Sequence, residues 1–408
     1  MGRTLDVFLK ERLVGRLEQD DSGSLWFSYS EEWLNAEDAV PLSISLPLRR
    51  ESYRRNECRP FFAGLLPEET SRELIAKAFG VSDKNDFAIL ERIGGECAGA
   101  VSLMPSGELP MAGSASYREI STEELTGKIA ELPQRPLLAG QEGIRLSLAG
   151  AQGKLAIAIF GGKYFLPLNG SPSTHILKPQ GPHFEGLVEN EFFCMRLAAL
   201  AGLKVAPVEI VAAVSTRFLQ VERYDRKLLD GDSLERLHQE DFCQALGIPP
   251  ELKYQQEGGP NLKKCFELIR AVSAVPGPDV LRLFDAVVFN YLIGNNDAHG
   301  KNFSLLYDDG KTRLVPLYDL VCTQAYPELA AESAMKIGDE RKSDRVVGKN
   351  WLKFFDDAGV GHAVARKRLK ALAVSVSKIV REMDESSPGW KLVSPVVLAN
   401  CARVLSLG

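Results

Sequence analysis

Long apolar runs are missing from this chain of 408 residues. No stretch reaches the roughly 18 uninterrupted apolar residues that mark a membrane-spanning helix. The first residues, MGRTLD, contain no apolar signal core. We therefore expect a cytoplasmic protein that neither crosses a membrane nor is secreted.

Cysteine and histidine are too scattered to suggest a metal site. The seven cysteines include no CxxC pair, and the five histidines include no HxxxH spacing. Structural zinc sites and redox pairs are built from such spacings. The pattern instead predicts reduced cysteines in a cytosolic core.

Positive charge is not in excess either. The 49 lysine and arginine residues face 54 aspartate and glutamate residues, which gives a net charge of −5. This balance argues against a broad nucleic-acid-binding surface, but it allows a local basic patch or a DNA-binding partner.

The patterns that are present predict an α+β protein in three parts: residues 1–137, 138–230 and 231–408. In the first part, alternating apolar residues predict strands near 5–9, 13–17, 25–29, 41–48 and 98–103. Helices are expected from about Pro67 to Ala78 and over 86–93. A segment rich in Pro, Gly, Ser and Glu, residues 104–140, predicts the first boundary.

The second part is predicted to be rich in strands, at 145–148, 154–160, 163–167, 174–178, 208–214 and 217–221, with one helix at 189–201. The third part is predicted to be mostly helical. Its helix at 279–293 is apolar on nearly every face and should be buried. Closing helices are expected at 364–383 and 393–407.

Three polar residues of the helical part carry the clearest chemical signal. Asp297 and Asn302 lie five residues apart, and Asp319 follows seventeen residues later. Protein kinases use a carboxylate to accept the proton of the attacking hydroxyl, and an amide and a second carboxylate to hold Mg²⁺ against the ATP phosphates. The spacing predicts phosphotransferase chemistry.

Two features upstream are suited to the phosphates of ATP. The loop SLAGAQGK, at residues 147–154, offers backbone N–H groups, although it is neither GxGxxG nor a Walker A motif and a plain hairpin turn is the alternative. Lys178 ends an apolar strand, and Glu191 follows on a helix. A buried ammonium needs anionic partners, so Lys178 is expected to meet phosphate and Glu191. A solvated strand-end lysine is the alternative.

Two further segments complete the predicted nucleotide site. The run ERYDR, at residues 222–226, precedes the helical part and could form a hinge. There Glu222 and Tyr224 would offer backbone groups to adenine and Asp225 would reach the ribose; a surface charge cluster is the alternative. Lys301 is expected to neutralise the transferring phosphoryl group. His299 either takes part in the site beside Lys301 or has only a structural role in the packing of the loop.

Together these motifs resemble the HipA family, the serine/threonine kinase toxins of bacterial type II toxin–antitoxin modules. The resemblance runs over nearly the whole chain. It rests on SLAGAQ (147–152), HILK (175–178), ERYDR (222–226), QEDFCQ (239–244), NDAHGKNFS (296–304), FFAGLLPE (61–68) and IGGECAGAV (93–101).

The resemblance implies a two-lobed, protein-kinase-like fold, also similar to lipid kinases, with a small mixed α/β N-terminal subdomain and a helical C-terminal lobe. It implies ATP and Mg²⁺ as cofactors, Asp297 as the catalytic base, and Asn302 and Asp319 as Mg²⁺ ligands. The implied ATP-binding residues are Ala149, Gly150, Ala151, Gln152, Gly153, Lys154, Lys178, Glu222, Arg223, Tyr224, Asp225, His299, Lys301, Asn302, Tyr318 and Asp319.

The resemblance also implies a means of self-inactivation. Ser147 matches the serine that the family autophosphorylates, and a phosphate there would add about −2 charge beside the ATP phosphates. An ordinary strand serine is the alternative. Where the family's loop usually has glutamate, this chain has Gly153, which predicts a more mobile loop and altered regulation.

Partners follow from the family as well. They are a small helix-turn-helix antitoxin of the HipB kind, operator DNA reached through that antitoxin, and a protein substrate. Glutamyl-tRNA synthetase, an aminoacyl-tRNA synthetase, is the substrate that the family leads us to expect. A kinase of small molecules or lipids, and a co-repressor scaffold for the antitoxin, are the competing functions.

Overall fold

The computed structural model describes residues 2–110, 115–150, 152–181, 183–213, 216–229 and 234–407. The chain divides into two compact units. Unit 1 comprises Met1–Pro179 and Val211–Pro250, and unit 2 comprises Gln180–Ile210 and Glu251–Gly408. Each unit is built from two separate stretches of sequence, so the predicted boundaries at residues 137 and 230 do not coincide with the limits of the units.

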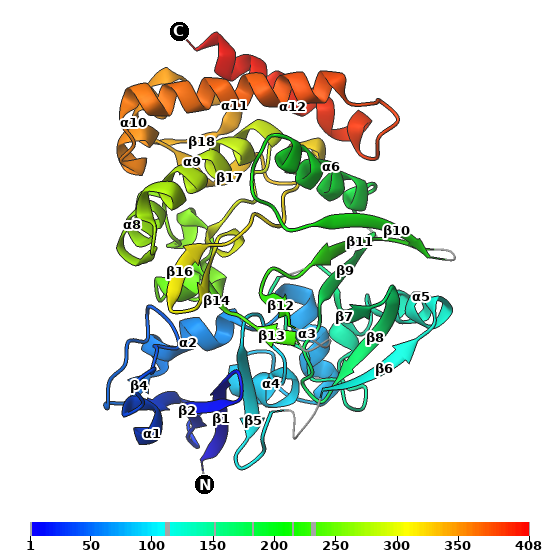
Figure 1. Cartoon of the computed structure of the whole chain (residues 1–408), viewed down its shortest axis with the longest axis vertical. Helices are drawn as coiled ribbons and strands as arrows, with labels where there is room; N and C mark the ends of the chain where they lie inside the picture. Colours follow the sequence, from blue (N-terminus) through cyan, green and yellow to red (C-terminus); the bar gives the residue numbers. More distant parts are fainter. Residues whose placement is uncertain are drawn as a thin grey trace. The chain divides into compact units, whose positions relative to one another are not determined.

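Unit 1 begins with a five-stranded antiparallel sheet in the order β4-β3-β2-β1-β5 (Figure 1). Helix α2 (Arg55–Gly64) packs against β3, where the rings of Phe62 and Phe27 lie 5.3 Å apart. The first three predicted strands are confirmed, because their alternating apolar residues face this core. The strands are β1 (Arg3–Leu9), β2 (Arg12–Gln19), β3 (Leu25–Tyr29), β4 (Tyr53–Arg54) and β5 (Val101–Pro105).

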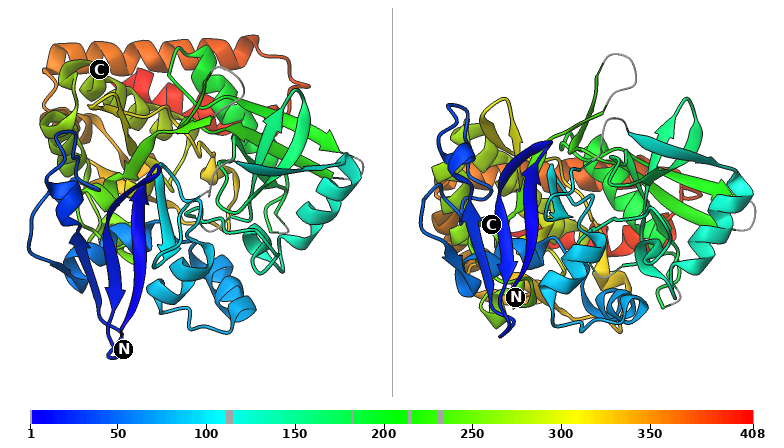
Figure 2. Two further views of the ribbon diagram at one scale, coloured as in Figure 1. Left: turned by 60° about the horizontal axis from the view of Figure 1, so that its bottom comes forward. Right: turned by 90° about the horizontal axis from the view of Figure 1, so that it is seen from below.

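A second sheet has six strands in the order β10-β11-β9-β7-β8-β6. In Figure 2 its cyan and green strands run side by side. The predicted strands of this part are confirmed except for 145–148, where Leu146 forms only an isolated bridge with Glu96. The strands are β6 (Ser116–Ile120), β7 (Leu155–Phe160), β8 (Lys163–Leu168), β9 (His175–Pro179), β10 (Val208–Ala213) and β11 (Thr216–Glu222).

The segment at 104–140, predicted to contain a boundary, contributes regular structure. Strand β6 pairs with β8, with Ser116 opposite Leu168. Helix α5 (Thr122–Glu131) follows, and the Ser121 hydroxyl caps it by accepting from the Glu124 N–H. The remaining elements of unit 1 are α1 (Glu31–Leu34), α3 (Glu69–Phe79), α4 (Asp86–Ile93), η1 (Pro136–Leu138), β12 (Arg226–Leu228), β13 (Leu234–Arg236), β14 (His238–Asp241) and α7 (Phe242–Ala245).

Unit 2 is mostly helical, as predicted. Helix α9 (Pro276–Ile293) is buried along most of its length, and α11 (His362–Glu382) and α12 (Trp390–Ser406) lie side by side and contact it (Figure 1). Its other elements are α6 (Leu187–Leu200), η4 (Gln255–Glu257), α8 (Leu262–Val272), η5 (Gly300–Asn302), β15 (Ser304–Asp308), β16 (Lys311–Leu314), η6 (Thr323–Ala325), β17 (Glu332–Ile337), β18 (Glu340–Lys342), η7 (Ser343–Arg345) and α10 (Gly348–Ala358), while η3 (Pro250–Leu252) spans the division between the units.

The predicted strand at 41–48 is wrong. These residues form a turn whose one bridge joins Ser43 and Leu46. The turn wraps around a buried carboxylate, because Glu240 accepts hydrogen bonds from the Ile44 N–H at 3.0 Å and from the Ser43 hydroxyl. Alternating apolar residues alone do not reveal such a distant side-chain partner.

The predicted start of the helix near Pro67 is also corrected. Helix α3 begins at Glu69, because Pro67 instead forms a parallel bridge with Gly150. Phe61, which the same apolar run contains, belongs to the separate helix α2, which ends at Gly64 and accommodates Pro60.

All seven cysteines are buried and none forms a disulfide, so their predicted place in the core is confirmed. Burial raises the pKa of the Cys97 thiol to about 12, so this thiol stays protonated at neutral pH. Within the described residues, no helix is both long enough and apolar enough to cross a membrane.

Candidate active site

The loop that carries Asp297 starts where α9 ends. Gly294 caps the helix in the left-handed conformation (φ 71°), and a Cβ there would lie 2.8 Å from Val396 Cγ1. Asn295 then donates to Asn290 Oδ1 at 2.8 Å and accepts from the Asp297 N–H at 3.1 Å. Buried amides therefore fix the direction in which the chain leaves the helix.

Asp297 and Asn302 are joined by hydrogen bonds across one 3₁₀ turn. The His299 N–H donates to the Asp297 carbonyl at 2.8 Å and to Asn302 Oδ1 at 3.1 Å, and the Asn302 N–H donates to the His299 carbonyl at 3.0 Å. The His299 ring is buried and packs edge-on against Tyr254, with centroids 5.3 Å apart. This position agrees with the packing alternative for His299, whereas Asp297 itself is exposed.

Asp319 belongs to the same hydrogen-bonded structure. The hydroxyl of the preceding Tyr318 donates to the Lys301 carbonyl at 2.7 Å and lies 2.6 Å from the Ser304 hydroxyl. Asp319 itself is left-handed, with φ 52°. Strained backbone of this kind concentrates at functional sites. Hydrogen bonds thus connect the segments that carry Asp297, Asn302 and Asp319, the three residues predicted from their spacing.

Glu191 lies on α6, which is fixed to the segment after Asp319. The neighbouring Asn190 donates to the Cys322 carbonyl at 3.0 Å and accepts from the Cys322 N–H at 2.8 Å. Both Asn190 and Glu191 are buried. Glu191 belongs to unit 2 and Lys178 to unit 1, so their ion pair stays a prediction.

The residues of the Asp297 loop suit Mg²⁺ by their chemistry. Asn302 offers an amide oxygen and Asp319 a carboxylate, both hard oxygen donors, and Mg²⁺ is typically held by one or two protein ligands together with phosphates and water. Across the described ranges, no group of three or more His, Cys, Asp or Glu side chains is placed to hold a metal ion. A metal bound by Asn302 and Asp319 would need additional ligands from a phosphate or water.

The loop at 147–154 lies in unit 1 and packs against the N-terminal segment. The Ser147 hydroxyl is completely buried and donates to the Leu65 carbonyl at 2.7 Å. Gly150 is left-handed (φ 103°), and its carbonyl accepts from the Glu68 N–H at 3.4 Å. Lys154 Nζ donates to the Ala149 carbonyl at 2.5 Å.

Gln152 and Gly153 are both described, and no atom lies within 4 Å of a Cβ built on Gly153. The predicted residue Ala151 lies outside the described residues. The loop is therefore not a plain hairpin turn, because its first half is held by partners far away in the sequence.

Lys178 lies on β9, paired with Leu219 of β11, and is buried rather than solvated. The solvated alternative is therefore wrong. Strand β11 leads directly into the predicted hinge, where the Arg223 N–H donates to the Thr174 carbonyl at 2.9 Å and the Tyr224 hydroxyl lies 2.5 Å from Gln239 Oε1.

The hinge is anchored by a buried charge cluster, so the surface-cluster alternative is also wrong. Glu96 is completely buried and accepts from Arg223 at 3.1 Å and from Arg226 at 2.6 Å. Asp225 accepts from both Arg223 and the Gly99 N–H, at 2.7 Å and 2.6 Å. Asp225 therefore has partners within unit 1, and its contact with the ribose stays a prediction.

The cluster keeps its charges in spite of burial. Burial opposes the ionisation of Glu96, but the guanidinium groups of Arg223, Arg226 and Arg236 outweigh it and hold the pKa of Glu96 below its ordinary value. For Asp225, burial is likewise outweighed by Arg223 and Arg226, so its pKa is lowered. Glu96 and the hinge are therefore held together as ion pairs.

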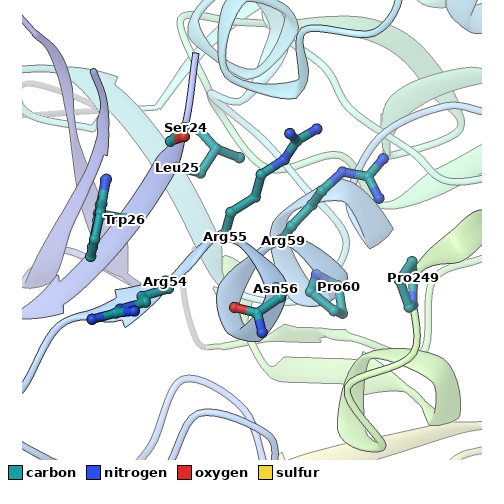
Figure 3. A pocket seen from close by; sticks show the side chains of 9 residues that line it. All are labelled: Ser24, Leu25, Trp26, Arg54, Arg55, Asn56, Arg59, Pro60 and Pro249. Carbon is teal, nitrogen blue, oxygen red and sulfur yellow. The ribbon is translucent and has the colours of Figure 1, made fainter. Parts of the chain in front are cut away.

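Unit 1 also has a pocket of about 550 Å³, which is separate from these residues. Figure 3 shows Arg55 and Arg59 extending from α2 along one side of the pocket. Arg59 pairs with Asp86 at 2.7 Å, and the Arg54 guanidinium lies 5.8 Å from the Trp26 ring centroid. No residue that the sequence predicted for the site lines this pocket.

The order of sheets and helices, together with the Asp297 loop, defines an α+β fold of the protein-kinase-like class. A model of the HipA-like C-terminal domain matches residues 146–386, and a model of the HipA N-terminal domain matches residues 5–104. The chain belongs to the HipA family.

Individual relatives agree with this assignment. The chain is 50% identical over 389 residues to the putative kinase Y4mE of Sinorhizobium fredii, which covers 94% of this chain and 93% of that protein. It is 31% identical over 424 residues to the serine/threonine-protein kinase toxin HipA of Shewanella oneidensis, with 98% and 96% covered. The structure of the Shewanella oneidensis MR-1 complex of HipA, HipB and operator DNA matches with a TM-score of 0.86, at 29% identity, over 99% of this chain and 98% of that chain.

Three residues that contact the predicted site residues or their segments were not predicted from the sequence. They are Glu96, Asn190 and Tyr254, which contact the hinge, the Asp319 segment and Asp297. For Asn190 a signal existed, because an amide in the middle of an apolar helix needs a partner. For Glu96 and Tyr254 the partners are more than 40 residues away in the sequence, and no local pattern indicates them.

Proposed function

We propose that this chain is an ATP-dependent, Mg²⁺-requiring serine/threonine protein kinase. The observation that carries the proposal is the hydrogen-bonded structure that joins the segments of Asp297, Asn302 and Asp319 through the Tyr318 hydroxyl. Membership of the HipA family and similarity to proteins named as kinases support it.

In this proposal each residue acts on one part of the reaction. Asp297 accepts the proton of the acceptor hydroxyl, since an exposed carboxylate can reach a protein substrate. Lys178 holds phosphate oxygens, with Gly150 and its loop supplying backbone N–H groups. Asn302 and Asp319 bind Mg²⁺, which when bound neutralises charge on the phosphates.

The remaining residues of the predicted set are assigned in the same way. Lys301 neutralises charge on the transferring group, and the backbone of Glu222 and Tyr224 meets adenine. The structural contacts of His299 favour a packing role for it in the loop.

The experiment that tests the kinase is transfer from γ-labelled ATP in a lysate of the host bacterium. We expect one labelled protein, and no label with Asp297→Gln. A labelled metabolite instead of a protein would favour a small-molecule kinase. Equal labelling by the variant would contradict the role of Asp297.

We further propose that the chain is the toxin of a type II toxin–antitoxin pair, and that it binds a small helix-turn-helix antitoxin of the HipB kind. The relative named as a kinase toxin and the complex of HipA with HipB and operator DNA support this. The net charge of −5 suits a chain that reaches operator DNA through its partner.

We expect expression of the chain to arrest growth. Co-expression of a helix-turn-helix protein encoded by a neighbouring gene should relieve the arrest. Asp297→Gln should remove toxicity and keep antitoxin binding, whereas lost binding with retained toxicity would contradict the assignment. Retained binding with no toxicity in the wild-type chain would favour a co-repressor scaffold. Glutamyl-tRNA synthetase is the first substrate to assay, on the family's precedent.

Finally, we propose that Ser147 is autophosphorylated and that this inactivates the kinase. Because the Ser147 hydroxyl is buried and donates to the Leu65 carbonyl, its modification requires the loop to leave the N-terminal segment. A phosphopeptide containing Ser147 should be found by mass spectrometry in the wild-type chain and be missing from Asp297→Gln. Its persistence in that variant would mean that another kinase modifies it.

A further inference from the structure

Tyr254 contacts the proposed catalytic base directly. It lies just before η4, and its phenol O–H donates to Asp297 Oδ1 at 2.8 Å. Asp297 is exposed and Tyr254 is half-buried, so the hydrogen bond between them forms near the protein surface rather than deep in the core.

The two residues that follow Tyr254 are held in place by hydrogen bonds. The neighbouring Gln255 accepts from the Lys336 N–H of β17 at 2.9 Å, and Gln256 accepts from Arg341 at 2.7 Å. The Tyr254 ring packs edge-on against His299 of the catalytic loop, with an interplanar angle of 78°. These contacts make Tyr254 a fixed part of the loop's surroundings.

We propose that Tyr254 is a positioning residue for Asp297. By donating to Oδ1, the phenol restricts the rotation of the carboxylate, and in this proposal the carboxylate takes the proton of the acceptor hydroxyl through Oδ2. The acceptor oxygen then bonds to the γ-phosphorus of ATP, the bond from that phosphorus to the β–γ bridging oxygen breaks, and ADP leaves. This inference rests on the proposed kinase function, and it adds a residue that acts on the base without touching the nucleotide.

The opposite role for Tyr254 is a blocker. A phenol bonded to the base resembles an acceptor hydroxyl, and a blocker would have to swing away before each turnover. The packing of the Tyr254 ring against His299, together with the anchoring of Gln255 and Gln256, argues against such movement. The two roles give opposite results on removal of the hydroxyl.

The test uses the full chain and compares Tyr254→Phe with the wild type in labelled phosphate transfer. Because positioned bases contribute about 10²–10⁴-fold to rate, we expect the variant to lose about ten-fold or more in kcat, with KM for ATP and the melting temperature unchanged. Tyr291→Phe is the matched control. It removes a phenol hydrogen bond of 3.0 Å to the Ser343 carbonyl elsewhere in unit 2, and it should keep full kcat.

A double-mutant cycle separates positioning from a merely structural effect. In the Asp297→Asn background, adding Tyr254→Phe should cause no further loss of kcat, because the hydroxyl acts only through the base. An unchanged or raised kcat in Tyr254→Phe, or an equal loss in the Asp297→Asn background, would overturn the inference. If the wild-type chain and Asp297→Asn transfer phosphate equally, the proposed function fails and the inference fails with it. That result differs from one in which the kinase is active and depends on Asp297 but keeps its kcat in Tyr254→Phe, where the inference alone fails.

Discussion

Glu96 shows how a single buried carboxylate can hold a functional segment. It accepts hydrogen bonds from Arg223 and Arg226, which belong to the predicted hinge. We expect Glu96→Gln to destabilise the chain by about 3–5 kcal/mol at pH 7, because the arginines would then be buried without a compensating charge. Urea unfolding measures this loss. The control is Glu124→Gln, which breaks an exposed pair with Arg118 and should cost less than about 1 kcal/mol.

The same substitution has a defined pH dependence. The pKa of folded Glu96 lies below the ordinary value of 4.5, so its stabilisation is fully present above that pH and is lost as the pH falls through the folded pKa. The difference in unfolding free energy between the wild type and Glu96→Gln should therefore be constant near neutrality and shrink below pH 4.5. A difference that grows with acidity would contradict the ion-pair description.

Two glycines of the proposed phosphate loop differ in how well they would tolerate a side chain. Gly150 has φ 103°, and a Cβ there would lie 2.7 Å from Lys154 Nζ, whereas Gly153 has open space around it. Gly150→Ala should cost about 1–3 kcal/mol of unfolding free energy through backbone strain and should also slow phosphate transfer. Gly153→Ala is the control and should stay within about 0.5 kcal/mol of the wild type. Equal effects at the two sites would contradict the conformation of the loop.

At the scale of elements, the side-chain amide of Asn190 connects α6 to the segment that follows Asp319. Asn190→Ala would leave the buried N–H of Cys322 without the side-chain oxygen that accepts from it, and the Cys322 carbonyl would keep only its hydrogen bond from the Ala325 N–H. We expect a loss of about 2 kcal/mol or more in unfolding free energy, together with slower phosphate transfer, since Glu191 lies on the same helix. Asn261→Ala, which removes the cap of α8, should cost about 1 kcal/mol and leave the transfer rate unchanged. A similar loss of transfer in both variants would show that stability alone decides the rate.

Elements with a strong local pattern could be predicted from the sequence, and those shaped by distant partners could not. Helix α9 and strands β1 to β3 follow from apolar periodicity. Residues 41–48 have the alternation of a strand but form a turn, because Glu240 binds their backbone from nearly 200 residues away. Helix α3 starts later than expected because Pro67 pairs with Gly150.

At the scale of the whole molecule, the predicted site shows the same difference between features set by local sequence and features set by distant partners. Asp297 and Asn302 could be predicted because one loop sets their spacing. Sequence order predicts that Asp225 could reach the ribose, whereas its partners Arg223 and Gly99 are visible only in the fold. Tyr254 has no pattern of its own, and only folding brings it to Asp297. Spacing therefore predicts which residues lie close together along one loop, but it does not predict their partners from distant parts of the sequence.

Binding of ATP should stabilise the whole chain. A ligand that binds only the folded state at 100 times its Kd adds about 2.7 kcal/mol, which is a rise of several degrees in melting temperature. We expect this rise with ATP and Mg²⁺ together and a smaller one when EDTA removes the metal. Asp319→Asn should lose only the part that depends on Mg²⁺, because the proposed metal ligand is weakened while Lys178 still meets the phosphates.

Lys178→Met should lose the greater part of the rise, because a buried ammonium that binds phosphate has no apolar substitute. Lys227→Met is the matched control on an exposed lysine of β12, and it should respond to ATP as the wild type does. Differential scanning fluorimetry with a titration of ATP measures each shift. An equal rise in Lys178→Met and Lys227→Met would place the nucleotide elsewhere in the chain, and a rise that ignores EDTA would remove Mg²⁺ from the binding step.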